Sequence, residues 1–138
     1  MTEMRLEETL FAATLLACAT IGRAAAQTAP AGAFDPTATP AQVCAIGYAR
    51  AHRKVPYRVR DLVYDRYRLP RGSRRGYVID HLIPLEIGGT NAIANLWPQP
   101  RAAAHRKDRD EDRLHGEVCS GEISLAAARA EILRLWKR

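Results

Sequence analysis

The sequence predicts a small α+β domain. Its 138 residues leave room for one domain, and no internal repeat is present. Two short β-prone segments, at 77–79 and from 95 onward, are separated by a loop rich in glycine and proline. Segments with apolar residues at helical spacing lie before and after this pair. The expected order is therefore helix, helix, strand, loop, strand, helix, helix.

The N-terminus has features of a secretory signal peptide. Residues 9–22 form an apolar run that is too short and too rich in alanine and threonine for a good membrane span. Small residues at Ala24 and Ala26 fit cleavage before Gln27. We therefore expect removal of residues 1–26 and export to the periplasm or out of the cell, with no stable membrane span after processing.

Two other interpretations of the N-terminus stay open. Acidic residues outnumber Arg5 ahead of the apolar run, which is atypical of a signal peptide. The run could form a buried N-terminal helix, although it has no amphipathic stripe. Residues 15–18 could also be a lipoprotein cleavage box, in which the bulky Leu16 is unusual.

The composition of the mature chain favours a polyanionic partner and one disulfide. Residues 27–138 contain 19 Lys and Arg against 12 Asp and Glu, an excess that favours binding to polyanions such as nucleic acid. Cys44 and Cys119 remain after processing, and an exported pair predicts a disulfide that contributes roughly 2–4 kcal/mol. Neither cysteine has a C-x-x-C neighbour, so a zinc site of that type is not expected.

Two helices are expected ahead of the first strand. Residues 27–40 are rich in proline, alanine and threonine without periodicity, so we expect a flexible leader before a domain at 41–138. A second helix is predicted over 58–67. The first is predicted over 41–53 despite Gly47, with three apolar positions facing inward, at Val43, Ile46 and Ala49.

The centre of the chain is expected to form a strand, a loop and a second strand. The β-branched run at 77–79 predicts a strand that enters the core, and Asp80 and His81 follow it directly. Residues 82–94 contain proline, glycine and asparagine and are expected to form a loop. A second short strand is predicted from Asn95, and two prolines are expected to end it.

Two helices are expected to complete the domain. The first spans about 102–118, with Gly121 just past its end, and Ser124 is expected to cap the second. Asp110 falls on the same helical stripe as Leu114, where an apolar residue would pack better. Apolar residues of the last helix recur at helical spacing and, with Trp136, are expected to close the core, at Leu125, Ala128, Ile132 and Leu135.

The adjacent pair Asp80 and His81 is the first candidate for a catalytic site. A carboxylate suits a hard cation, and an imidazole with an ordinary pKa of about 6.5 can act as a base near neutral pH. Neighbouring side chains of a strand point to opposite faces, so at a strand end one can hold metal while the other faces substrate. Asp-His pairs also occur by chance, so the pair alone is not diagnostic.

A longer pattern around this pair resembles the HNH endonuclease family of the ββα-metal superfamily. Residues 77–108 read YVIDHLIPLEIGGTNAIANLWPQPRAAAHRKD. The flanks CAIGYAR at 44–50 and VCSG at 118–121 also resemble a group of small exported bacterial HNH proteins. The resemblance implies an α+β fold with a small ββα-metal core and additional N-terminal and C-terminal helices. It also implies endonuclease activity.

The resemblance assigns roles to four residues. Asp80 resembles the metal ligand of the first strand, and His81 resembles the general base that takes a proton from the attacking water. Asn95 matches the middle letter of HNH, which implies either a metal ligand or a residue that holds His81, and both remain open. His105 resembles the metal ligand of the helix. One divalent ion is therefore implied, with Mg²⁺ favoured over Mn²⁺, Ni²⁺ or Zn²⁺.

These residues also have ordinary structural interpretations. A histidine at the start of an exposed helix, such as His105, is usually solvated, and an asparagine such as Asn95 often begins a strand or a loop. Gly88 and Gly89 fit the loop of the family, but a tight turn requires such residues as well. Asp108 lies one helical turn beyond His105 and could orient its ring or form a simple surface ion pair.

Basic residues flank the expected site. They form two groups, before the first strand and at the start of the following helix, at Arg71, Arg74, Arg75, Arg101, Arg106, Lys107 and Arg109. The candidates for binding phosphate oxygens are Arg75, Arg101 and Lys107, with an affinity that falls as salt rises. The sequence has no separate module for recognising bases, so low sequence specificity is expected. The alternative is a solvated surface of alternating charge.

The sequence thus supports three hypotheses. The first is a monomeric, metal-dependent endonuclease that hydrolyses DNA, and RNA as a further substrate, with low sequence specificity. The second is a catalytically inactive nucleic-acid-binding module with an HNH-like fold. The third is an envelope-associated protein whose basic surface meets anionic lipid or cell-wall polymer. Only the first requires the site residues to converge, namely Asp80, His81, Asn95 and His105.

Overall fold

The structure, a computed structural model, describes residues 29–137, so the expected signal peptide at 1–26 lies outside the described residues. The described part is a small mixed α+β domain with a two-stranded antiparallel sheet, which confirms the predicted α+β class. Its elements are α1 (Pro40–Val43), α2 (Tyr48–His52), α3 (Tyr57–Arg66), η1 (Arg71–Gly76), β1 (Tyr77–His81), η2 (Leu85–Ile87), η3 (Ile93–Asn95), β2 (Leu96–Pro100), α4 (Arg101–Cys119) and α5 (Leu125–Trp136).

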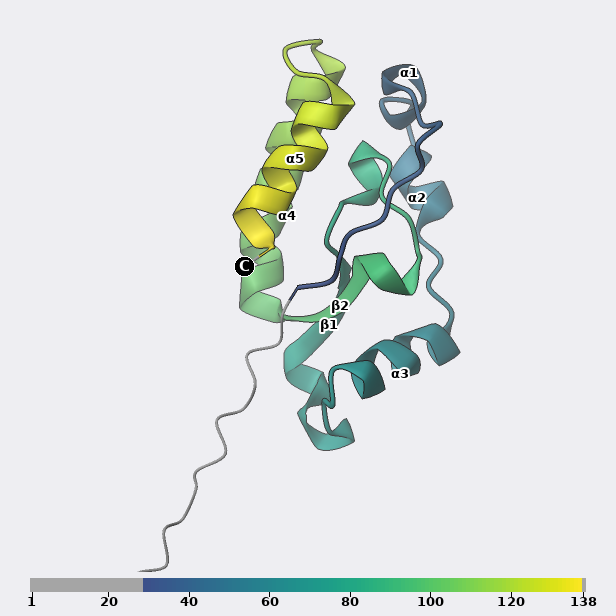
Figure 1. Ribbon diagram of the computed structural model, residues 1–138, viewed down its shortest axis with the longest axis vertical. Coiled ribbons are helices and arrows are strands. Elements are labelled where there is room, and N and C mark those ends of the chain that lie inside the picture. The colour runs from purple at the N-terminus through teal and green to yellow at the C-terminus, as the bar shows by residue number, and fades with distance from the viewer. Residues whose placement is uncertain (1–28, 138) are drawn as a thin grey trace, which may run out of the picture.

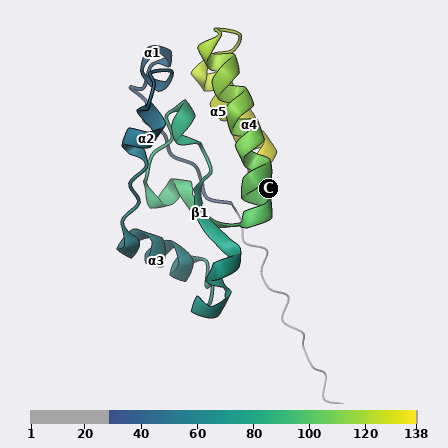
Figure 2. The same ribbon diagram turned by 180° about the vertical axis from the view of Figure 1, so that it is seen from behind.

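The helices are arranged around the sheet. Figure 1 shows α4 and α5 side by side along one flank, α1 and α2 along the other, and α3 across the end. From behind, β1 lies in front, between α3 and α4 (Figure 2). Within 29–137, no helix is both long enough and apolar enough to cross a bilayer.

The second strand extends further than the sequence predicts. Strand β1 pairs with β2 so that Tyr77 lies opposite Pro100 and Ile79 opposite Pro98. The two prolines therefore lie within β2, whereas we expected them to end it. In a two-stranded sheet each strand is hydrogen-bonded along one side only, so proline is tolerated where its nitrogen points away from the partner strand.

Helices α4 and α5 supply much of the core, as predicted. The Oγ of Ser124 caps α5 by accepting a hydrogen bond from the Ala127 N–H at 3.1 Å. Asp110, which interrupts the apolar stripe of α4, accepts a hydrogen bond from the Trp136 indole at 2.9 Å, so its carboxylate is used in the packing of the two helices. The buried apolar residues of these helices are Leu114, Val118, Leu125, Ala128 and Ile132.

The predicted helix over 41–53 is instead two short helices. Helix α1 ends at Val43, and Gly47, with a left-handed φ of +84°, is the N-cap of α2. The break leaves Ile46 fully exposed, although its spacing predicted an inward position, while Val43 is buried as expected. The next predicted helix is present as α3.

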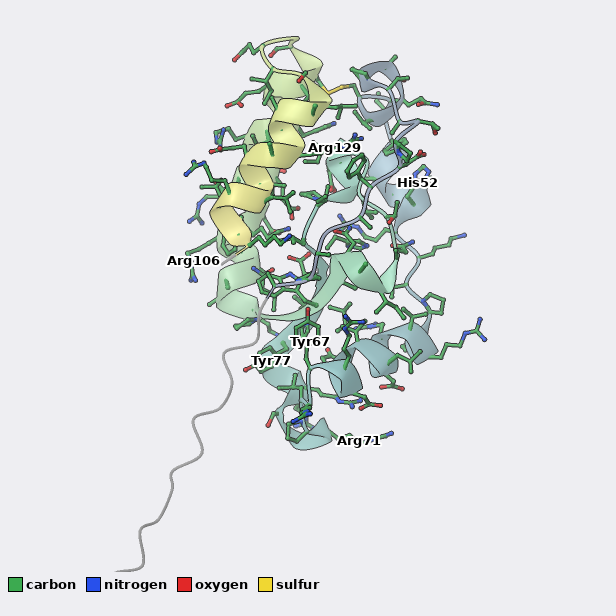
Figure 3. All side chains as sticks on the ribbon, in the orientation of Figure 1. His52, Tyr67, Arg71, Tyr77, Arg106 and Arg129 are labelled. Atoms are coloured by element: carbon green, nitrogen blue, oxygen red, sulfur yellow. A yellow bond between two sulfur atoms is a disulfide. The ribbon has the colours of Figure 1, made fainter. Side chains whose placement is uncertain are left out.

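The segment 29–39 packs against the domain, whereas the sequence predicted a flexible leader here. The Gly32 N–H donates to the Ala94 carbonyl at 2.8 Å. Arg129 of α5 lies over the ring of Phe34, with its guanidinium carbon 4.3 Å from the ring centre (Figure 3). A cation held over an aromatic face is attracted by the ring quadrupole, which fixes this segment to α5.

The predicted disulfide joins the start of the domain to the end of α4. Cys44 and Cys119 are bonded, and their Cα atoms lie 5.7 Å apart. His115 lies close to both sulfur atoms, with all three potential ligand atoms within 4.8 Å of one another. While the sulfurs are bonded to each other neither is a thiolate, so this group offers no thiolate ligand in the oxidised protein.

Reduction of the disulfide is expected to lower the free energy of unfolding by roughly 2–4 kcal/mol, because the reduced chain regains the entropy of an open loop. Urea denaturation with and without reductant measures this difference. The variant with Cys44→Ser and Cys119→Ser is the control, since reductant should leave its midpoint unchanged. Equal midpoints for the oxidised and reduced wild-type protein would contradict the prediction.

Candidate functional site

A pocket lies beside the end of β1. Its volume is about 380 Å³, and it is bordered by the α2–α3 connection, α3, β1, η2 and α4. The chemically active side chains on its wall are Arg53, Arg60, Asp80, His81, Glu86, Asp108 and Glu111. The strand-end pair predicted from the sequence therefore borders a pocket, together with acidic and basic groups from other elements.

Asn95 holds the loop that follows His81. Its side chain is fully buried. Its amide oxygen accepts from the Ile83 N–H at 2.8 Å, and its amide nitrogen donates to the carbonyls of Ile83 and Thr90, both at 2.9 Å. The resemblance left open whether Asn95 binds metal or hydrogen-bonds across the loop to hold His81. In this structure its amide group contacts loop backbone, so it fixes the position of β1 through the loop.

Asn91, which the sequence analysis missed, contacts the ring of His81. Its Oδ1 lies 2.8 Å from Nε2 of His81. The Asn91 amide nitrogen donates to the carbonyls of His52 and Lys54, which orients the oxygen toward the ring. An oxygen acceptor requires Nε2 to carry the proton, so the neutral ring keeps its lone pair on Nδ1.

The environment of His81 favours its neutral form. Burial lowers the pKa of the imidazole, while the hydrogen bond with Asn91 and the nearby carboxylate of Asp80 oppose this shift in part. A buried imidazole loses hydration most in its charged form, so a lower pKa is the expected direction. The ring is therefore predominantly neutral at pH 7 and can accept a proton.

Lys107 lies at the centre of the site. Its side chain is fully buried. The ammonium donates to the His81 carbonyl at 2.6 Å, forms a short ion pair with Glu111, and lies 3.4 Å from Oδ2 of Asp80. The other oxygen of Asp80 accepts from the His81 N–H at 2.8 Å. Oδ2 is buried without a hydrogen-bond partner among the described residues.

The carboxylate of Glu111 is costly to ionise. Its pKa is raised to about 7, mainly by burial and also by the carboxylates of Asp80 and Glu86, while Lys107 opposes the shift. The folded protein holds this proton more tightly than the unfolded chain does. Stability contributed by the protonated group is therefore lost as the pH rises from about 4.5 to about 7.

The three predicted metal ligands do not share a site. His105 has a side chain that is 79% exposed, and its Nδ1 lies 3.6 Å from the carboxylate of Asp108. Two residues along a helix correspond to a rotation of about 200°, so His105 points away from the side where Lys107 meets Asp80. Asp80 and Asn95 are engaged by other groups, as described above. Among the described residues, the group of three His, Cys, Asp or Glu side chains that lie close enough to hold an ion includes neither Asp80 nor His105.

The basic residues predicted to bind substrate divide into two kinds. Arg75 and Arg101 are exposed and adjacent, because the Arg101 Nε–H donates to the Arg75 carbonyl at 2.9 Å. Lys107 is buried and its ammonium is taken up by protein groups. The basic side chains at the pocket are instead Arg53 and Arg60, of which the first lies 2.9 Å from Glu86.

Some of the site residues that were not predicted are nevertheless indicated by a pattern in the sequence. Glu111 follows Lys107 by four residues, the spacing at which opposite charges pair on a helix. Asn91 had no such signal, because an asparagine after two glycines is equally typical of a plain turn. Arg53 follows the end of α2 and lines the pocket, and no local pattern near Arg53 indicates this position.

Comparisons with known proteins give no assignment, because no family model, curated protein or solved structure matches the chain. The fold and the site therefore carry the functional argument. They define a small α+β domain with a neutral histidine at a strand end, beside a buried cluster of two carboxylates and one ammonium.

Proposed function

We propose that this protein hydrolyses phosphodiester bonds in nucleic acid, with His81 as the general base. The observation that carries the proposal is the contact of His81 Nε2 with Asn91 at 2.8 Å on the wall of a pocket that also holds Arg53 and Arg60. A fixed, neutral imidazole with one basic nitrogen is what activation of a water molecule requires.

The proposed reaction uses one water molecule for each bond that is cleaved. Nδ1 of His81 takes a proton from the water, and the water oxygen forms a bond to phosphorus. The phosphorus–oxygen ester bond breaks, and the leaving alkoxide takes a proton from solvent. The imidazolium then releases its proton to solvent, so the products are a phosphate monoester and an alcohol.

The charge of the protein supports an anionic substrate. Arg53 and Arg60 border the pocket, and the arginine of the Arg53–Glu86 pair can exchange that carboxylate for a phosphate oxygen. Arg75 and Arg101 offer a further basic surface along the chain. Contacts of this kind recognise the backbone and not the bases, so cleavage should show low sequence specificity and weaken as salt rises.

A cleavage assay tests the proposal. The oxidised protein is incubated with end-labelled single-stranded and double-stranded DNA and RNA, in separate reactions with EDTA, Mg²⁺, Mn²⁺, Ni²⁺ or Zn²⁺. The expected result is cleavage at many positions of at least one substrate. No cleavage of any substrate by protein that binds these nucleic acids would refute the proposal.

The pH dependence of cleavage should follow the titration of His81. Because burial lowers its pKa, the base stays neutral to a lower pH than an exposed histidine would. We expect kcat/KM to remain constant as the pH falls from 8 to about 6.5 and to decline tenfold per pH unit below the pKa of His81. A decline that begins above the ordinary histidine pKa would contradict the assignment.

A second candidate function is binding of nucleic acid without hydrolysis. It is favoured by the exposed position of His105, which leaves the predicted ion site incomplete. This alternative predicts salt-dependent binding of the same oligonucleotides and no cleavage under any of the conditions above. The cleavage assay therefore separates the two candidates.

A further inference from the structure

We infer that the buried ammonium of Lys107 takes the place of a divalent cation, so that this site works without a metal ion. The inference rests on the proposed function where it concerns hydrolysis. Where it concerns metal binding, it rests on the geometry of Lys107 alone. That geometry is a set of three oxygens around Nζ, which belong to the His81 carbonyl, Asp80 and Glu111.

The oxygens around Nζ are of the kind that a hard cation prefers. Mg²⁺ and Mn²⁺ bind carboxylate and carbonyl oxygens, and both kinds face Nζ here. The site also has the charge for a cation, because two carboxylates converge on it from β1 and α4. A positive charge is already supplied from within the chain, one helical turn before Glu111.

Lys107 occupies the position between Asp80 and Glu111 that a bound ion would take. Its side chain has no exposed surface, and its ammonium contacts both carboxylates. An ion bound to Asp80 and Glu111 would have to displace the ammonium and leave it buried near another cation. That arrangement costs several kcal/mol, because a buried charge needs a partner.

Lys107 acts as a positioning residue under this inference, because its ammonium touches protein groups and not the substrate. Its bond to the His81 carbonyl, 2.6 Å long, fixes the backbone of the general base. Its charge also allows Asp80 and Glu111 to lie close together beside the pocket. The lysine thereby does what a bound ion would do: it neutralises the two carboxylates and orients the backbone of His81.

The wild-type protein provides the first test, with Mn²⁺ as the probe. Calorimetric titration of the oxidised wild-type protein with Mn²⁺ should show no binding at Asp80. An Asp80→Asn variant should therefore give the same titration curve as the wild type. The rate of nucleic-acid hydrolysis should change less than twofold between EDTA and millimolar Mn²⁺. A single Mn²⁺ bound through Asp80, or a rate that EDTA abolishes and Mn²⁺ restores, would overturn the inference.

The Lys107→Ala variant provides the second test, because it removes the internal cation and leaves the oxygens. This variant should bind Mn²⁺, and its Tm should rise by about 10 °C at a Mn²⁺ concentration of one hundred times Kd. The double variant Lys107→Ala/Asp80→Asn should lose that response. If Lys107→Ala folds but does not respond to Mn²⁺, the oxygens do not form a cation site and the inference fails.

An exposed pair on the same helix provides the matched control. Arg113 pairs with Glu117 at 3.0 Å with the same four-residue spacing as Lys107 and Glu111. Arg113→Ala removes a helix cation without opening a cluster at Asp80, so its Tm should not respond to Mn²⁺. A response equal to that of Lys107→Ala would show that Mn²⁺ binds carboxylates of α4 in general and would refute the inference.

Failure of the inference and failure of the proposed function give different results. If the protein cleaves no nucleic acid, the Mn²⁺ titrations of the wild type and of Lys107→Ala still decide whether the lysine replaces an ion. If the protein cleaves nucleic acid only with Mn²⁺, the proposed function stands and the inference is wrong. If Lys107→Ala does not fold, the wild-type titration and the EDTA experiment decide.

Discussion

Replacement of His81 by alanine is expected to lower the rate of nucleic-acid hydrolysis by about 10²–10⁴-fold, the usual contribution of a general base. The imidazole is the group beside the pocket whose neutral form is favoured by burial and whose tautomer is fixed by Asn91. The carboxylates of Asp80 and Glu111, which neighbour the imidazole, are engaged with Lys107 and therefore do not replace it as a base. Single-turnover cleavage of a labelled oligonucleotide measures the effect.

Binding of nucleic acid should be unchanged in the His81→Ala variant, because the proposed phosphate contacts come from arginines. His115→Ala is a suitable control, since this half-buried histidine contacts the Val43 carbonyl at 3.2 Å, near the disulfide. The control should cleave at the wild-type rate. An unchanged rate in His81→Ala would exclude His81 as the base.

Asn91→Ala should have a smaller effect on the same rate. The variant keeps the imidazole but loses the oxygen that requires Nε2 to carry the proton. Nδ1 then shares the proton with Nε2, so only part of the population presents a basic Nδ1. A larger loss in Asn91→Ala than in His81→Ala would contradict the proposed order of roles.

The parts of the fold that the sequence predicts are those with local periodic patterns. A β-branched run predicts β1, and helical spacing predicts α3, α4 and α5. The predicted helix over 41–53 shows where this reasoning fails, because it is two short helices, with the left-handed Gly47 at the start of the second and Ile46 exposed between them. Helical spacing could not indicate that break, since the apolar positions on either side keep the same period.

The candidate site depends on the rotation of α4 about its axis, which the sequence does not determine. The family resemblance implies that His105 faces the ion, and Lys107 was expected to bind substrate or to face solvent, as lysine usually does. In the structure the two are exchanged, with Lys107 buried and His105 exposed. Asp110 is compatible with this rotation of α4. Its carboxylate faces α5, where the Trp136 indole donates a hydrogen bond to it in place of water.

Replacement of Gly89 by alanine is expected to lower the free energy of unfolding by more than about 3 kcal/mol, at the severe end of single substitutions. A Cβ at this position would lie 1.8 Å from the Ile83 carbonyl oxygen. The obstacle is backbone and not the end of a flexible side chain. The same part of the loop is held by the Gly89 N–H, which donates to the Pro84 carbonyl at 2.8 Å, and by the amide of Asn95 on Ile83. Relief of the clash therefore breaks these bonds.

Gly116→Ala is the matched control for this substitution. Gly116 lies within α4, and a Cβ there would meet no heavy atom of the described residues within 4 Å. Alanine should stabilise the helix by about 0.5–1 kcal/mol, because glycine loses more backbone freedom on folding. Urea denaturation of the three proteins measures both effects, and a midpoint for Gly89→Ala equal to that of the wild type would contradict the prediction.

The Gly89→Ala variant also separates positioning of the site from its chemistry. The loop that Gly89 closes contains Asn91 and is tied to the end of β1 through Asn95, so a displaced loop moves the partner of the His81 ring. Where the variant is still folded at low temperature, its activity should fall toward that of Asn91→Ala, while its Tm falls far below that of Asn91→Ala. Loss of stability with full activity would mean that Asn91 reaches His81 independently of the turn at Gly89.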